Sequence, residues 1–243
     1  MAERYTVVAT DLRGNGVSSK PQGLADHSTY SKRAMAADQV AVMRTFGFET
    51  FFICAHDRGA RVTHRLCLDF PRAVRKAILL DIAPTRAMYE QTNRAFATAY
   101  FHWLFLIQPE PLPELLIGAN PDAYIDIDAV MGNRSAGMAP FTPEVQQAYR
   151  SALRSPGAVH AMCEDYRASS TIDLEHDREH VQSVACPLRV LWGRHGIVGR
   201  LFDPLHEWRQ VATDVTGREL DSGHYIPEEA PEALLAEIQD FLR

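Results

Sequence analysis

Four strand-length apolar runs divide this chain, and they constrain its fold more than any other feature of the sequence. They read YTVVATD at 5–11, FFICAHD at 51–57, KAILLDIAP at 76–84 and LRVLWGRHG at 188–196. The runs lack the strict apolar–polar alternation of a strand that has one wet face. Such runs are typical of parallel strands that are buried on both faces.

The segments between the first three runs have helical character. YSKRAMAADQVAVMRTFGFE (30–49) spaces its apolar residues at roughly helical intervals, and Gly47 marks its C-terminal stop. RGARVTHRLCLDFPRAV (58–74) is also expected to be a helix, which should end before Pro71. Strand, helix, strand, helix, strand is the order of a parallel sheet joined by crossover helices. The sequence therefore predicts an α/β fold.

The stretch between the third and fourth apolar runs differs from the rest of the chain. It is helical in pattern, rich in aromatic residues and broken by several prolines. We therefore expect residues 85–184 to form a helical cap, inserted into a core made of residues 1–84 and 185–243. The second part of the core should hold a weaker strand near TGRELDSG and a closing helix at APEALLAEIQDFL.

The composition argues against several classes of function. A formal net charge of −6 and a pI near 5.9 argue against binding to nucleic acid, which usually needs an excess of basic residues. No apolar run approaches the length of a membrane span, and the N-terminus lacks the layout of a secretory signal, so a cytoplasmic protein is expected. The cysteines have no metal-ligand spacing, and no metal or cofactor is expected.

Asp57 stands where a buried apolar run turns into a helix. A carboxylate at such a position commonly caps the helix. Capping does not account for the flanking His56 and Gly59, or for Arg58 and Arg61. The pattern H-D-R-G-A at a strand-to-helix turn resembles the nucleophile elbow of the α/β-hydrolases, with Asp in place of Ser.

Further segments resemble the same superfamily in the expected order. VVATDLRGNGVSS resembles its D-x-R-G-x-G-x-S loop, Asp81 follows the next strand, and His224 lies in DSGHYIPEE before the last helix. The resemblance implies an α/β-hydrolase fold, a mostly parallel sheet flanked by helices. An Asp nucleophile attacks sp³ carbon and forms an ester, which an activated water must then hydrolyse. His224, oriented by Asp81, is the expected base for that water.

The segment HDRGARVTHRL is similar to that of the haloacetate dehalogenase family, which includes the fluoroacetate dehalogenases. Two guanidinium groups beside the nucleophile, from Arg58 and Arg61, suit a substrate that carries its own carboxylate. In this family a His–Trp pair and a Tyr of the cap donate hydrogen bonds to the departing halide. His102, Trp103 and Tyr166 match them. The resemblance implies hydrolysis of a 2-haloacid, such as fluoroacetate or chloroacetate, to glycolate and halide.

An epoxide hydrolase is the alternative within enzymes, because it uses the same Asp–His–Asp machinery. It needs cap tyrosines to protonate the epoxide oxygen, and Tyr166 with Tyr100 or Tyr124 could supply them. The arginine pair argues against it, since unpaired cations buried beside a neutral substrate are costly.

The start of the chain motivates a third interpretation. Members of the superfamily begin with further strands and an H-G-x-P loop before the segment that TDLRG resembles, whereas MAERYTVVATD begins directly at that strand. We therefore expect an N-terminally truncated α/β-hydrolase fold with an exposed sheet edge. It could be an inactive relative that binds small carboxylates. The expected partner is a small haloacid, without nucleic acid or membrane, and assembly as a homodimer is left open.

Overall fold

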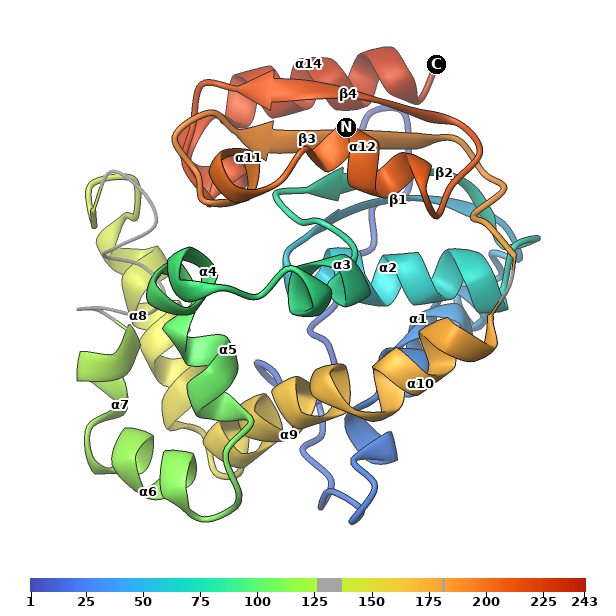
Figure 1. Cartoon of the computed structure of the whole chain (residues 1–243). Coiled ribbons are helices and arrows are strands. Elements are labelled where there is room, and N and C mark those ends of the chain that lie inside the picture. The colour runs from blue at the N-terminus through green and yellow to red at the C-terminus, as the bar shows by residue number, and fades with distance from the viewer. Residues whose placement is uncertain (126–136, 181) are drawn as a thin grey trace.

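A parallel sheet forms the centre of the computed structural model, which describes residues 1–125, 137–180 and 182–243 (Figure 1). Every pair of neighbouring strands is parallel, which confirms the predicted α/β architecture. In their order across the sheet, the strands of the described chain are β1 (Phe51–His56), β2 (Val74–Leu80), β3 (Leu188–Gly193) and β4 (Val215–Leu220).

The helices α1 (Lys32–Thr45) and α2 (Arg58–Asp69) end where the sequence indicates. At the start of α1, the Ser31 side chain accepts a hydrogen bond from the Ala34 N–H. Just beyond its end, Gly47 has φ 83°, a left-handed conformation that glycine adopts without strain. The described helices outside the chain between β2 and β3 are η1 (Ser28–Tyr30), α1, α2, α11 (Val198–Leu201), α12 (Pro204–Arg209), α13 (Ile226–Glu229) and α14 (Pro231–Phe241).

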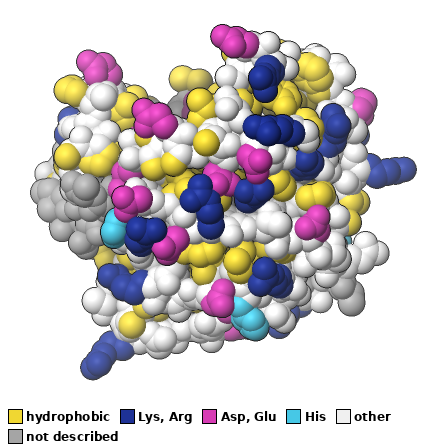
Figure 2. Space-filling model, turned by 90° about the horizontal axis from the view of Figure 1, so that it is seen from above, with side chains coloured by type: hydrophobic (Ala, Val, Ile, Leu, Met, Phe, Trp, Pro, Cys, Tyr) yellow, Lys and Arg dark blue, Asp and Glu magenta, His cyan; other side chains and the backbone are white. Residues whose placement is uncertain are grey.

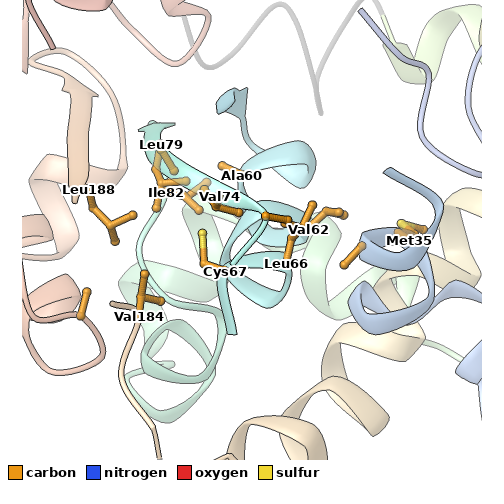
Figure 3. Packing of buried hydrophobic residues seen from close by; sticks show 14 of the residues in the cluster. Met35, Ala60, Val62, Leu66, Cys67, Val74, Leu79, Ile82, Val184 and Leu188 are labelled. Carbon is orange, nitrogen blue, oxygen red and sulfur yellow. The ribbon is translucent and has the colours of Figure 1, made fainter. Parts of the chain in front are cut away.

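Both faces of the sheet are buried at its central strands β2 and β3, which explains why these two strands lack alternation. On one face, Ile78 of β2 belongs to an apolar cluster with Leu234 of α14. On the other face, Leu79 of β2 packs in a second cluster with Val62 and Leu66 of α2 (Figure 3). Consecutive residues of β2 thus enter opposite apolar layers, and a polar residue at either position would face a core.

The described chain between β2 and β3 is mostly helical, and we call residues 85–125 and 137–179 the helical insert. It lies on the α2 side of the sheet, away from α14 (Figure 1). Its buried residues Phe96, Trp103, Leu106 and Tyr166 form an apolar cluster that also includes Ile197 beside α11. Its helices are α3 (Thr85–Glu90), α4 (Arg94–Ala99), α5 (Phe101–Leu106), α6 (Leu112–Ala119), α7 (Pro121–Ala123), α8 (Pro143–Arg154), α9 (Ala158–Ser170) and α10 (Ile172–Glu179).

Residues 5–11, which the apolar pattern predicts to be a strand, do not form one. The Tyr5 ring meets the Phe52 ring of β1 edge-on at 6.1 Å, and the Tyr5 hydroxyl donates to the Leu242 carbonyl at 3.1 Å. Val7 remains 60% exposed. In the described chain no strand lies beside this segment, and without a hydrogen-bonding neighbour β-branched residues do not make a strand. The prediction was wrong for this run, and β1 is an edge strand.

The face seen from above α14 mixes basic and acidic side chains (Figure 2). Lys and Arg side chains lie among Asp and Glu side chains on this face. Within the ranges that the structure describes, no helix combines the length and the apolar character needed to cross a membrane.

Candidate active site

Asp57 occupies the turn between β1 and α2 in a strained conformation. Its backbone has φ 43° and ψ −112°, a region that costs a non-glycine residue on the order of 1–3 kcal/mol. Its N–H donates to the Leu80 carbonyl at 3.3 Å, and its own carbonyl accepts from the Arg61 N–H at 3.1 Å. The side chain makes no capping hydrogen bond to α2. A strained turn with a carboxylate that the helix does not use is typical of a nucleophile elbow.

Asp57, Asp81 and His224 lie together at the carboxyl edge of the sheet. Asp57 follows β1, Asp81 follows β2, and the loop after β4 carries His224. His224 Nδ1 is 2.6 Å from Asp81 Oδ2, and His224 Nε2 is 3.6 Å from Asp57 Oδ2. The other Asp81 oxygen accepts from the Gly193 N–H at 3.0 Å. Because Asp81 is buried and engaged at both oxygens, it holds the imidazole with Nε2 toward Asp57.

The charges of this trio oppose the effect of burial. Burial alone would raise the pKa of Asp57, but the interaction with His224, helped by Arg61, holds that pKa well below its usual value. Burial alone would lower the pKa of His224, yet the carboxylates of Asp57 and Asp81 raise it to about 9. At neutral pH an imidazolium therefore lies between two carboxylates in the resting protein.

Removing the Asp57 charge should lower the pKa of His224. Asp57→Asn keeps the shape of the side chain and deletes one of the two carboxylates that raise this pKa, so only Asp81 then opposes the effect of burial. Titration of the His224 imidazole by NMR should show a lower midpoint in the variant than in the wild type. An unchanged midpoint near 9 would mean that Asp57 does not control the charge of His224.

Arg58, the first residue of α2, is tied to α9 of the helical insert. Its Nε donates to the Asp165 carboxylate at 2.6 Å, and its Nη2 donates to the Asp165 carbonyl at 3.1 Å and to the Ser169 hydroxyl at 2.6 Å. The other Asp165 oxygen accepts from Lys32 Nζ. Burial would lower the pKa of Arg58, but the Asp165 charge raises it. Arg58 is thus a neutralised cation, and its Nη1 is buried without a partner among the described residues.

Arg61, one helical turn further along α2, has neutral partners. Its Nη1 donates to the Thr85 hydroxyl at 3.0 Å, its Nη2 lies 3.1 Å from the Met88 sulfur, and its guanidinium lies 4.7 Å from the centroid of the Trp103 ring. Only 4% of Arg61 is exposed, and no carboxylate of the described chain forms an ion pair with it. Burial, followed by the neighbouring Arg58 charge, lowers its pKa. Of the two arginines, Arg61 is therefore the one that forms no ion pair within the described chain.

His102, Trp103 and Tyr166 form one buried aromatic group in the helical insert. The rings of His102 and Trp103 meet the Tyr166 ring nearly edge-on, with centroids 5.7 Å and 6.0 Å away. Trp103 lies against Arg61, and the Arg58 guanidinium lies 4.3 Å from the Tyr166 centroid. The two arginines of α2 thus connect the turn at Asp57 to this aromatic group.

The tyrosines considered for an epoxide hydrolase lie in or beside the same group. The Tyr100 ring is 5.9 Å from the rings of both His102 and Trp103, and Tyr124 packs against the surrounding apolar cluster. In residues 1–125, 137–180 and 182–243, no group of three or more His, Cys, Asp or Glu side chains is arranged to hold a metal ion.

Sequence reasoning missed the residues that support this site. Asp165 directly precedes Tyr166, and Lys32 begins α1, but no local pattern connects them with Arg58. Thr85, which accepts a hydrogen bond from Arg61, begins a short helix and stands in no recognisable motif. Only proximity to motif residues could have drawn attention to Asp165.

Comparison with known proteins places this geometry in a family. A family model described as alpha/beta hydrolase fold matches residues 1–231. This chain belongs to the α/β-hydrolase family. Over its 243 residues, the chain is 43% identical to a fluoroacetate dehalogenase from Burkholderia, of which it covers 80%. This identity confirms that the chain belongs to the haloacetate dehalogenase family, which the segment HDRGARVTHRL resembles.

More distant and structural relatives agree with the α/β-hydrolase assignment. A soluble epoxide hydrolase from Corynebacterium is 25% identical over 97% of the chain and 80% of that protein. A solved alpha/beta hydrolase structure from Nostoc sp PCC 7120 is 51% identical, with a TM-score of 0.91 over 96% of this chain and 79% of that one.

Proposed function

We propose that this α/β-hydrolase cleaves the carbon–halogen bond of haloacetate-type 2-haloacids, converting fluoroacetate or chloroacetate to glycolate and halide. The observation that carries the proposal is Arg61, a buried cation one helical turn after Asp57 that has no ion pair with a carboxylate of the described chain. Such a cation favours a substrate that brings its own negative charge. The 43% identity to a Burkholderia fluoroacetate dehalogenase supports the same chemistry.

In the first step, an oxygen of Asp57 attacks the α-carbon of the substrate, and the halide leaves with the electrons of the broken bond. Arg61 binds the substrate carboxylate, while His102, Trp103 and Tyr166 donate hydrogen bonds to the leaving halide. Fixed donors in a buried group stabilise the charge that develops there without having to reorganise. This step leaves a carboxymethyl ester on Asp57.

The second step depends on the change in charge that the ester brings. Ester formation removes the negative charge of Asp57, which is one of the two carboxylates that raise the pKa of His224. His224 then gives up its proton more readily, and its neutral Nε2 accepts a proton from the attacking water. The water oxygen adds to the ester carbonyl, glycolate leaves, and the Asp57 carboxylate is restored. Overall, haloacid and water give glycolate, halide and one proton.

Measurement of halide and glycolate during incubation with fluoroacetate or chloroacetate tests this function directly. Equimolar release of the two products is expected. Binding of acetate without turnover of either haloacid would contradict the proposal and would favour the carboxylate-binding relative considered above.

Arg61→Ala should weaken haloacid turnover by about 2–4 kcal/mol in kcat/KM, because the substrate carboxylate loses a charge-assisted partner. Arg61→Lys is the matched control, since it keeps the charge but not the planar fork, and its loss should be smaller. Steady-state kinetics on chloroacetate and calorimetric titration with acetate should show the same ranking. Full acetate affinity in a folded Arg61→Ala protein would remove Arg61 from the carboxylate site.

Hydrolysis of an epoxide is the second candidate, and the positions of Tyr100 and Tyr166 favour it. Both tyrosines lie around His102, so two hydroxyl groups of the helical insert belong to one buried group. A neutral epoxide would leave Arg61 without an ion-pair partner, which is why we rank this function below dehalogenation. Turnover of styrene oxide in the absence of haloacid turnover would reverse the order.

A further inference from the structure

Side chains from other elements bind the backbone of the loop that carries His224 at three consecutive residues, 223–225. The Glu229 carboxylate accepts from the Gly223 N–H at 2.7 Å and from the Tyr225 N–H at 2.9 Å, on either side of His224. The carbonyl of His224 accepts from His56 Nε2 at 2.8 Å. Two side chains from separate elements, β1 and α13, thus fix the backbone of His224 without touching its imidazole nitrogens.

His56 supplies its hydrogen bond as a neutral donor. A carbonyl oxygen only accepts, so the hydrogen lies on Nε2 of the His56 ring. Burial, and then the positive charge of His224, lower the pKa of His56 to about 4. Its ring lies 4.6 Å from the His224 ring and 6.1 Å from that of Tyr225. His56 therefore supports the loop without adding a second positive charge beside Asp57.

On another side, the loop that carries His224 packs against the end of β3. A Cβ atom on Gly193 would lie 1.9 Å from the Gly223 carbonyl oxygen and 2.7 Å from that of Ser222. The Ser222 carbonyl also accepts from the His195 N–H at 3.0 Å. The loop therefore lies directly on the backbone of β3, and the hydrogen bonds to Glu229 and His56 hold it on its other sides.

We propose that Glu229 is a positioning residue for His224 and acts on the hydrolysis of the ester. His224 Nε2 is 3.6 Å from Asp57 Oδ2, beyond hydrogen-bond distance, so no bond to Asp57 fixes the imidazole. Its place is set by the contact with Asp81 and by the loop that Glu229 holds. The kinetic part of this inference rests on the proposed function, in which His224 serves only the second step.

Glu229→Gln tests the proposal. Each carboxylate oxygen of Glu229 accepts from a backbone N–H, and in the variant the amide NH₂ of Gln replaces one of these oxygens. An NH₂ group cannot accept from an N–H, so one of the two hydrogen bonds is lost. Glu228→Gln is the matched control: Glu228 lies next to it in α13 and accepts from the Tyr149 hydroxyl at 2.8 Å, which an amide oxygen can also do. We expect kcat on chloroacetate to fall by about 10- to 100-fold in Glu229→Gln, as for a general base displaced by part of an ångström. Glu228→Gln should retain wild-type kcat.

The ratio of the kinetic constants separates positioning from general damage. The ratio kcat/KM reports the steps up to release of halide, so Glu229→Gln should preserve it while kcat falls. Mass spectrometry during turnover should show more ester on Asp57 than in the wild type. An equal fall of kcat and kcat/KM, or an unchanged kcat, would overturn the proposal.

A titration that needs no turnover keeps the inference independent of the proposed function. If the wild-type chain releases no halide, the proposed function fails, but the position of His224 can still be followed by NMR. The pKa of its imidazole, raised to about 9 by Asp57 and Asp81, should fall in Glu229→Gln and stay unchanged in Glu228→Gln. An equal midpoint in the wild type and in Glu229→Gln would show that Glu229 does not position His224.

Discussion

Asp57→Asn should abolish halide release from fluoroacetate and chloroacetate, with a fall of about four orders of magnitude or more in rate. The amide has no negative charge to direct at the α-carbon, so the ester cannot form. The fold should survive, because the Asp57 side chain does not cap α2 and Asn has the same shape as Asp, so the substitution adds no steric strain to the turn. A halide electrode measures the rate, and thermal unfolding checks the fold.

Slow deamidation of the new Asn would regenerate Asp57 and restore activity. Activity that grows with storage time, together with a matching mass change in the peptide that contains residue 57, therefore supports the proposed role. Constant and substantial turnover in freshly prepared Asp57→Asn protein would show that another group attacks the substrate.

His224→Asn should separate the two halves of the reaction. Asp57 can still displace the halide, but no imidazole remains to take a proton from water, so the ester persists. One halide per active site should be released rapidly and turnover should then stop. Mass spectrometry after incubation with chloroacetate should find the carboxymethyl group on Asp57.

Together, the Asp57 and His224 variants test which of the two residues acts in each step of the reaction. If His224 also took part in the first step, His224→Asn would release no halide in the rapid phase and Asp57 would remain unmodified. If His224 were dispensable, turnover would continue at the wild-type rate. Either result would require a different assignment of nucleophile or base.

Much of the fold could be predicted because it follows from local patterns. Buried runs without alternation, separated by helical segments, indicated a parallel sheet, and parallel strands end at a common edge. Asp57 and Asp81 follow two such strands, so their proximity was implied by the order of elements. The run at 5–11 has the same composition, but a strand also needs a neighbour, and a sequence pattern does not show which neighbour is there.

The supporting residues of the site could not be predicted, because their partners are remote in sequence. Arg58 and Asp165 are 107 positions apart, and their ion pair exists only once α9 lies against α2. Glu229 looks like a surface acid beside Glu228 until the loop at 223–225 folds onto its carboxylate. Sequence reasoning treated Arg58 and Arg61 alike, whereas the structure neutralises one of them and leaves the other without an ion pair in the described chain.

In the proposed function, a guanidinium that is buried without an ion pair in the described chain makes the empty protein less stable than the protein with a bound substrate carboxylate. Desolvation of the Arg61 cation lowers the free energy of unfolding, and an anion bound beside it adds stability that grows with the logarithm of its concentration. Heat, denaturants and proteases act on the unfolded fraction, which the bound anion depletes. If Arg61 binds the substrate carboxylate as proposed, the lifetime of this chain should therefore increase with the concentration of small carboxylates around it.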